Sequence, residues 1–354
     1  MSAAPPAPAL ENRPVDVLMV GHAAAGHVGC HWQKAAGQLG LNWHWMEASE
    51  AYAGPVWWRR LAWRLLDRRP ASLLRFEREL WQRCLGHRPR VLLVSGITPP
   101  RAALLRGLRN LGIRTVNFLT DHPFNPAHRS RWFSAALREY DSVHTPRAAT
   151  LEALSAAGCR RVRSLPFAYD PQAHRPPLED EGGELPSGIG HSALFIGGAD
   201  SDRAQWLRPL LDSEAPLALR GGYWQRWPEY AALAGGHADE AQMRALVAAA
   251  GVNLGLVRLA NADDHSMRSY ELAAIGGVLL MQDTSHHRRL FGPPGEAVWY
   301  ASDPQELAMR AGELLRLPAS VRQSMRERAR RCVVNAANRY ADRLRALLQE
   351  DSSS

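Results

Sequence analysis

The sequence has few cysteines and almost no lysine. Its four cysteines, at positions 30, 84, 159 and 332, lack the paired spacing of zinc ligands or of a disulfide framework, so we expect them to behave as small buried hydrophobic side chains. Lys34 is the single lysine among 43 basic residues, and the net charge is +8. This composition fits either a solvated arginine-rich surface or a face for an anionic partner, such as a membrane, nucleic acid or a phosphorylated ligand.

Long apolar runs are missing as well. No segment approaches the ~18 uncharged apolar residues that a membrane-spanning helix needs. Residues 1–14 lack the basic-then-apolar order of a signal peptide, so we predict a disordered tail there and a cytoplasmic protein. With 354 residues and 46% hydrophobic content, the chain is long enough for two domains of ordinary size.

Fingerprints of several binding classes are absent. The segment Val15–Gly21 predicts a buried strand, but the loop from Gly21 to His27 does not have the GxGxxG spacing of a dinucleotide site. The sequence also contains no zinc-finger spacing, no aromatic-glycine RNA motif and no lysine-rich arm. A basic nucleic-acid-binding protein therefore remains only a weak alternative.

Short apolar strands alternate with helices of ten to fifteen residues in both halves of the chain. This alternation predicts a doubly wound parallel sheet in each half. We place a first domain at 15–175 and a second at 191–335. Residues 176–190, PPLEDEGGELPSGIG, have the composition of a linker, and 336–354 form a terminal helix and tail.

Residues 55–88 predict a pair of helices rich in tryptophan and arginine. The apolar side chains of the first helix share one face: Trp58, Leu61, Ala62, Leu65 and Leu66. The opposite face carries arginines: Arg59, Arg60, Arg64 and Arg68. Either the apolar face packs on its own domain, or the helix makes a peripheral contact with an anionic membrane.

The stretch from His265 to Phe291 carries the clearest functional pattern. It predicts a helix capped by Ser266 and ended by Gly276-Gly277, followed by a buried strand and a short basic helix. Arg268 and the backbone N–H groups of the first turn form a cationic end that suits an anion. Glu271 lies one turn further along, within reach of a neutral diol. This order suits a ligand with phosphates at one end and a ribose at the other.

This stretch resembles the donor-binding segment of GT-B glycosyltransferases, the glycosyl transferase family 1-like group, and especially the group resembling the spore-maturation protein CgeB. The shared pattern is an arginine, an aromatic-Glu pair, small residues and a double glycine before a strand. Here these are Arg268, Tyr270-Glu271, Ala273-Ala274 and Gly276-Gly277. Asp263 stands eight residues before Glu271, where retaining members of the family usually have a glutamate that contacts the sugar.

The resemblance implies further donor contacts in the second half. Family members have a glycine turn followed by an arginine, matched here by Gly197, Gly198 and Arg203, and a Gly-x-x-Trp segment under the donor base, matched by Gly222 and Trp224. Asp200-Ser201-Asp202 spells the metal-binding DxD of the GT-A architecture. Either aspartate is an equally good helix cap, so we predict no metal site.

For the first half, the resemblance implies a loop after the first strand that faces a central cleft. His22 and His27 are therefore acceptor-side candidates. Asp121, at the end of a predicted strand, is the candidate to deprotonate or orient the acceptor hydroxyl, with His122 in reserve; a capping aspartate is the alternative. The terminal helix, 336–354, is expected to cross back onto the first domain.

The implied activity is a metal-independent transfer of a sugar from a nucleotide-diphosphate sugar, a UDP- or GDP-sugar, to an acceptor hydroxyl. The donor is a co-substrate, and no cofactor is expected. The acceptor stays open: a glycan, a lipid-linked molecule, a protein or a small molecule, with a peripheral position at the inner face of the plasma membrane as one setting. The main alternative is a GT-B-shaped protein without transfer activity, such as an epimerase or a binding scaffold.

Overall fold

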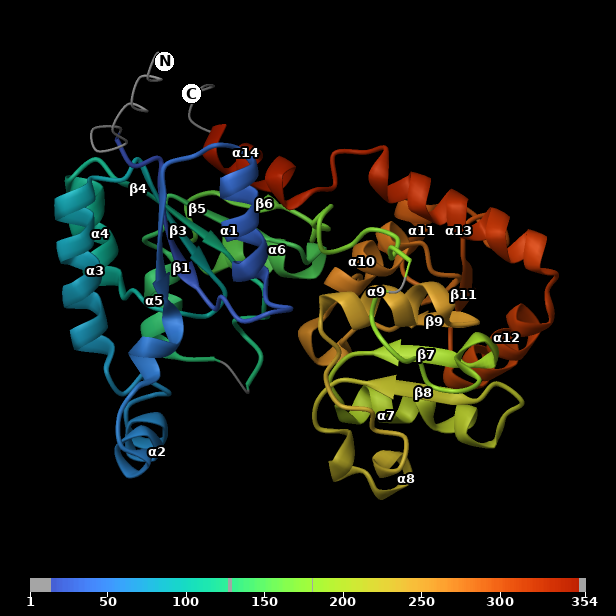
Figure 1. Cartoon of the computed structure of the whole chain (residues 1–354). Coiled ribbons are helices and arrows are strands. Elements are labelled where there is room, and N and C mark those ends of the chain that lie inside the picture. Colours follow the sequence, from blue (N-terminus) through green and yellow to red (C-terminus); the bar gives the residue numbers. More distant parts are fainter. Residues whose placement is uncertain (1–13, 127–128, 180, 350–354) are drawn as a thin grey trace, which may run out of the picture. The chain divides into compact units, whose positions relative to one another are not determined.

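The computed structural model describes residues 14–126, 129–179 and 181–349. The chain divides into two compact units, shown in Figure 1. The first runs to residue 145 and includes 152–163; the second comprises 146–151 and the chain from 164 onward. Residues 164–175, which we assigned to the first domain, thus pack with the second unit. The predicted disordered tail, 1–14, lies outside the described residues except for Pro14.

The first unit is built on a six-stranded sheet in the order β2-β1-β3-β4-β5-β6. The pairs β1–β2, β1–β3, β3–β4 and β4–β5 are parallel. Its strands are β1 (Val17–Gly21), β2 (Trp43–Glu47), β3 (Val91–Ser95), β4 (Arg114–Phe118), β5 (Ser142–Thr145) and β6 (Val162–Ser164). Its helices are α1 (Val28–Gln38), η2 (Ala48–Tyr52), α2 (Val56–Leu65), α3 (Leu73–His87), α4 (Ala102–Asn110) and α5 (Arg131–Leu137). Helix α6 (Ala148–Ala156) is shared, because its residues up to Leu151 belong to the second unit.

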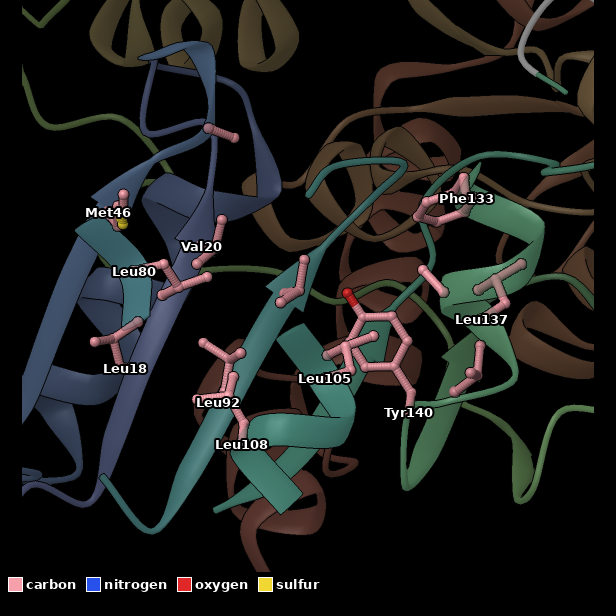
Figure 2. Close-up of a cluster of buried hydrophobic side chains, with 14 of the residues drawn as sticks. Leu18, Val20, Met46, Leu80, Leu92, Leu105, Leu108, Phe133, Leu137 and Tyr140 are labelled. Carbon is pink, nitrogen blue, oxygen red and sulfur yellow. The ribbon is translucent and has the colours of Figure 1, made fainter. Parts of the chain in front are cut away.

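Helices cover both faces of this sheet. On one face, Leu80 of α3 and Leu105 and Leu108 of α4 pack with Leu18 and Leu92 of the central strands, as Figure 2 shows. Each such leucine contributes about 1.5–3 kcal/mol to folding when it is fully buried. On the other face, α1 places the fully buried Trp32 ring edge-on against Phe118 of β4, 5.3 Å away. The first half is therefore doubly wound, as predicted.

The second unit is built on a five-stranded sheet in the order β11-β10-β9-β7-β8, and every neighbouring pair is parallel. Its strands are β7 (Ala193–Ile196), β8 (Leu217–Arg220), β9 (Val252–Gly255), β10 (Leu279–Gln282) and β11 (Trp299–Ala301). Its helices are η3 (Ile189–His191), α7 (Ser201–Leu207), η4 (Arg208–Asp212), η5 (Trp224–Arg226), α8 (Pro228–Ala231), α9 (Glu240–Ala249), η6 (Leu259–Asn261), α10 (Met267–Ile275), α11 (Ser285–Phe291), α12 (Pro304–Arg316), α13 (Ala319–Val334) and α14 (Tyr340–Gln349).

Adjacent residues of β9 show that helices also cover both faces of this sheet. Asn253 donates from Nδ2 to the carbonyl of Val247 in α9, at 3.0 Å. Its neighbour Leu254 packs in the core that contains Leu307 of α12. Since successive side chains of a strand point to opposite faces, α9 and α12 lie on opposite sides. The predicted doubly wound second half is confirmed.

In its described residues, 176–179 and 181–190, the predicted linker contains no strand and only the start of η3. Two ion pairs of Glu181 attach the linker to the second unit. The guanidinium groups of Arg244 in α9 and of Arg175 pair with the Glu181 carboxylate and lower its pKa to about 2. The linker is thus fastened to the second unit.

Helix α2 does not pack as its predicted apolar face suggests. Ala62 is buried and Trp58 is half-buried, but Leu65 is 71% exposed and Leu61 and Leu66 are also exposed. The alternative in which this face packs on its own domain is wrong for three of its five residues.

Cys84 and Cys159 are buried, as predicted, whereas Cys30 and Cys332 are half-buried. Among the helices of the described ranges, none is both long and apolar enough to cross a bilayer.

Candidate functional site

Helix α10 begins and ends as its sequence predicts. Ser266 is the N-cap, and its backbone N–H donates to Ser269 Oγ at 3.0 Å. Gly276 is the C-cap, with φ of 99°, a left-handed conformation that glycine adopts at little cost. The helix is buried from Ser269 to Ile275, so the fold fixes the position of its first turn.

Arg268 is held in place by two contacts. Its Nε donates to the carbonyl of Ile196 at the end of β7, at 3.2 Å, and its Nη1 donates to Glu271 Oε2. The side chain of Arg268 is 29% exposed, whereas that of Glu271 is 0% exposed. Glu271 Oε1 also lies 3.6 Å from His174 Nε2. The carboxylate is therefore enclosed and orients Arg268, which corrects the prediction that it is open to a diol.

Two glycine turns meet at the carboxyl ends of β7 and β8. The backbone N–H of Ala199 donates to the carbonyl of Gly222 at 2.9 Å. Gly221 has φ of 129°, and a Cβ there would lie 2.2 Å from the carbonyl oxygen of Gly197. Only glycine fits that position. The predicted glycines Gly197, Gly198 and Gly222 thus come together in one half-buried backbone surface, and Arg268 is held to the neighbouring carbonyl of Ile196.

Arg203 lies beneath this surface. Its Nη1 donates to the carbonyl of Gly198 at 2.9 Å, and its guanidinium stands 5.5 Å from the centre of the Phe195 ring. Burial, followed by the charge of Arg258, lowers the pKa of Arg203 to about 10, and Arg268 acts in the same direction. The carboxylates of Asp200 and Asp263 act in the opposite direction. An anion bound at the turn would also interact favourably with the three guanidinium groups.

Asp200 is the N-cap of α7, where its Oδ1 accepts from the backbone N–H of Arg203 at 2.9 Å. Its Oδ2 accepts from Arg258 Nε at 3.3 Å. The capping interpretation of the DxD triplet is confirmed for Asp200. No pattern in the sequence points to Arg258, and the structure adds it to the cationic group.

Asp263 pairs with Arg147, and both side chains are more than nine-tenths buried. Burial raises the pKa of Asp263, and the charge and hydrogen bond of Arg147 oppose that rise. The carboxylate anchors the loop before α10 and is closed to a sugar, contrary to the role that the resemblance implied. Arg147 lies 116 residues earlier in the chain, so no local pattern could have revealed it.

Trp224 does not lie open to a donor base, and that prediction is wrong. The ring is 0% exposed, its Nε1 donates to the carbonyl of Gly197 at 2.9 Å, and Tyr230 packs edge-on against it at 5.2 Å. It supports the glycine turn from below. The neighbouring Tyr223 is the outward aromatic: it is 59% exposed, has φ of 73°, and lies 4.5 Å from the guanidinium of Arg226.

Tyr270 and the histidines near α10 form a neutral, buried network. The His265 and His286 rings stack with centroids 3.6 Å apart and planes 11° from parallel, and His286 Nε2 lies 2.9 Å from the Tyr270 hydroxyl. Burial and the charge of His265 lower the pKa of His286 to about 3. Asp264, His265 and His286 place potential ligand atoms within 4.8 Å of one another. Stacked rings direct their in-plane lone pairs side by side, however, which does not suit a shared metal ion.

A second group of polar side chains lies in the first unit, at the carboxyl ends of β1, β2 and β4. His22 Nδ1 lies 3.1 Å from Glu47 Oε1, and Glu47 Oε2 accepts from the backbone N–H of Ala23 at 3.0 Å. The rings of His22 and His27 are 5.9 Å apart. Burial and then His22 lower the pKa of His27, while the carboxylates of Glu47 and Asp121 oppose that shift. The structure thus groups His22, His27 and Asp121, and adds Glu47.

His122 has a structural partner. Its Nδ1 accepts from the backbone N–H of Phe124 at 3.2 Å, so the neutral ring carries its proton on Nε2. In that tautomer the ring donates a hydrogen bond and does not act as a base. Asp121 accepts from the Thr120 hydroxyl at 3.0 Å.

Comparisons with known proteins agree with this geometry. Residues 203–349, which contain Arg203, Arg258, Arg268 and Glu271, match the family described as Glycosyl transferase-like. No curated protein matches the sequence.

Solved structures extend the likeness to both units. A trehalose-phosphate synthase from Burkholderia vietnamiensis is 14% identical, with a TM-score of 0.64 over 96% of this chain and 99% of that one. A sucrose-phosphate synthase from Thermosynechococcus elongatus is 13% identical, with a TM-score of 0.65 over 94% and 97%. At such identity the likeness establishes the GT-B fold, two Rossmann-like units. The family match and the fold together support a glycosyltransferase of the GT-B fold.

Proposed function

We propose that the protein transfers a sugar from a nucleotide-diphosphate sugar, a UDP- or GDP-sugar, to an acceptor hydroxyl. One observation carries the proposal. Three guanidinium groups, those of Arg203, Arg258 and Arg268, surround paired glycine turns at the carboxyl ends of two parallel strands. In doubly wound sheets ligands bind at that edge, and a glycine turn beside arginines suits a pyrophosphate.

Within this site the residues have different tasks. Arg258 and Arg268 keep exposed guanidinium surface and would contact the leaving diphosphate. Arg203 is buried beneath the turn, so it would contribute positive potential and hold Gly198. Glu271 would keep Arg268 oriented. Stabilising the diphosphate as it departs lowers the barrier to transfer without a metal ion.

The aromatic contact to the donor base is reassigned from Trp224 to Tyr223. The Tyr223 ring lies beside Gly198, where a Cβ would come within 3.9 Å of it. His237 flanks the same turn, with Nε2 3.1 Å from where a Cβ of Gly222 would lie. A base seated over this turn would therefore meet the Tyr223 ring.

Asp121 remains our candidate to receive the proton of the acceptor hydroxyl, with His27 and the His22–Glu47 pair beside it in the first unit. In an inverting reaction the hydroxyl oxygen bonds to the anomeric carbon, the bond to the diphosphate breaks, and Asp121 takes the proton. In a retaining reaction the departing phosphate takes the proton instead.

The acceptor class is open among glycans, lipid-linked molecules, proteins and small molecules. The same proposal includes three further points: membership of the CgeB-like group, a cytoplasmic setting, and a peripheral position at the inner face of the plasma membrane. Membership of the CgeB-like group is supported by the pattern of Arg268, Tyr270-Glu271 and the double glycine.

Thermal unfolding in the presence of UDP, GDP, dTDP and CMP tests the proposal. A ligand that binds the folded form raises the melting temperature by mass action. We expect at least one diphosphate nucleotide to do so, in the presence of a chelator. If no nucleotide shifts the wild-type protein, the proposed donor site is wrong.

Product analysis separates transfer from the alternative, an epimerase-like or scaffold protein. Release of the nucleoside diphosphate that depends on an added acceptor supports transfer. Free sugar without an acceptor product, or an isomerised donor, supports the alternative.

A further inference from the structure

Helix α2 exposes an apolar stripe that the donor site does not use, and this stripe bears on the peripheral membrane position named in the proposed function. Trp57, Leu61 and Leu65 lie four residues apart, on one side of the helix, and are 68%, 41% and 71% exposed. Six of the fifteen large apolar side chains that are exposed in the described part of the chain fall within residues 56–66. Scattered exposed leucines are ordinary, but such a concentration on one short helix marks a contact surface.

The helix is fixed on its inner side. Trp58 Nε1 donates to the carbonyl of Ala71 at 3.1 Å, and Ala62 is buried. In the turn that follows, Arg68 Nη2 donates to the carbonyl of Pro126 at 2.7 Å. Figure 1 shows α2 projecting from the body of the first unit. The stripe is therefore presented on a supported helix.

A basic groove runs beside the stripe. It has a volume of about 600 Å³ and is lined by arginines and aromatic rings: Arg59, Arg60, Arg64, Arg69, Trp63 and Tyr52. Residues 55–72 contain five arginines and a single acidic residue, Asp67. A surface with tryptophan and leucine on one side and several arginines on the other matches the headgroup region of an anionic bilayer, where guanidinium groups meet lipid phosphates.

We propose that α2 docks the protein on an anionic phospholipid surface. Charge favours this occupant over a second copy of the chain, because a symmetric pair of α2 helices would bring arginines against arginines. The ten residues of α2 span only about 15 Å, so the helix lies along the interface and does not cross it. The proposal names a partner for the first unit and does not depend on the donor site.

Co-sedimentation with vesicles tests it. We expect the full-length protein to pellet with vesicles that contain phosphatidylglycerol and to stay in solution with vesicles of phosphatidylcholine alone. Charge reversal of Arg60→Glu with Arg64→Glu is expected to lower the partition coefficient by about 25-fold or more, since each basic residue near an anionic surface contributes roughly fivefold. Trp57→Ser with Leu65→Ser is expected to remove the part of the binding that survives high salt.

The matched control is Arg328→Glu with Arg331→Glu, an equal charge change on exposed residues of α13. It should retain vesicle binding. Circular dichroism and thermal unfolding verify that all variants are folded. Equal binding to both vesicle types, an equal loss in the control, or competition by soluble glycerol phosphate would overturn the proposal. A dimer that forms without vesicles and is lost in Trp57→Ser with Leu65→Ser would assign the stripe to a second copy instead. Because nucleotide binding is measured separately, failure here leaves the donor site untouched.

Discussion

Replacing Arg268 by alanine separates the two tasks that the structure gives this residue. Arg268 donates a hydrogen bond to the fully buried carboxylate of Glu271 and is also the partly exposed cation beside the glycine turns. Removing one partner of a buried ion pair lowers the free energy of unfolding by about 3–5 kcal/mol. Because Arg268 keeps 29% of its side chain in solvent, we expect a loss of about 2–4 kcal/mol in the free energy of unfolding. Pyrophosphate or nucleoside diphosphate should bind about 10- to 100-fold more weakly, the value of one charge-assisted hydrogen bond.

A second variant distinguishes these effects. Arg268→Ala with Glu271→Gln leaves no buried charge at this pair, so the unfolding free energy should return to within about 1–2 kcal/mol of the wild type. Diphosphate binding should stay weak. The control is Arg310→Ala on α12, which also pairs three residues along its helix, with Glu313 at 3.1 Å, but at an exposed site. Arg310→Ala should lower the free energy of unfolding by less than about 1 kcal/mol.

Urea unfolding and calorimetric titration measure the two quantities. The reasoning is refuted if Arg268→Ala is as mild as Arg310→Ala. It is equally refuted if the double variant recovers diphosphate binding together with stability, because the arginine would then act only through folding.

Three further predictions follow from the other parts of the account. Burial lowers the pKa of His287 to about 4, so below about pH 6.5 the unfolded chain takes up a proton at this residue while the folded protein does not. The free energy of unfolding should therefore fall by about 2 kcal/mol between pH 7 and pH 5 through His287. Urea unfolding of His287→Gln at the two pH values should lack that part of the loss. In calorimetry, Tyr223→Ala should weaken nucleoside diphosphate binding about 5- to 100-fold and leave pyrophosphate binding unchanged. Tyr223→Phe should bind both ligands like the wild type. If Tyr223→Ala weakens nucleoside diphosphate and pyrophosphate binding equally, a base contact is excluded. Asp121→Asn should slow transfer by about 10²- to 10⁴-fold in product assays at unchanged donor affinity, and an unchanged rate would exclude Asp121 as the base.

The elements with purely local signals could be predicted from the sequence. The start and stop of α10 are set by Ser266 and Gly276, which act within one turn of the helix. Strands β3 and β7 are short apolar runs between turns, a local pattern that predicts buried strands. The edge strand β2, Trp43–Glu47, has no such run; it is mostly half-buried and gave no strand pattern. Glu47 was missed along with it.

The site residues that depend on distant contacts could not be predicted. Which of Tyr223 and Trp224 faces outward is decided by the positive φ of Tyr223, which tertiary packing imposes on a residue that rarely adopts it. The pairing of Arg147 with Asp263 joins segments far apart in the chain. The sequence patterns identified Arg203 and Arg268 but not Arg258. They assigned open roles to Asp263 and Glu271, because a carboxylate in a sequence carries no sign of whether an arginine will enclose it.

Calorimetric titration of the wild-type protein with a nucleoside diphosphate and the corresponding monophosphate, in the presence of a chelator, tests the central claim that guanidinium groups bind a pyrophosphate at the glycine turns. The account predicts that the diphosphate binds at least about tenfold more tightly, because its second phosphate gains a charge-assisted contact with Arg258 or Arg268. Equal affinity for the two nucleotides, or no binding of either, would contradict it.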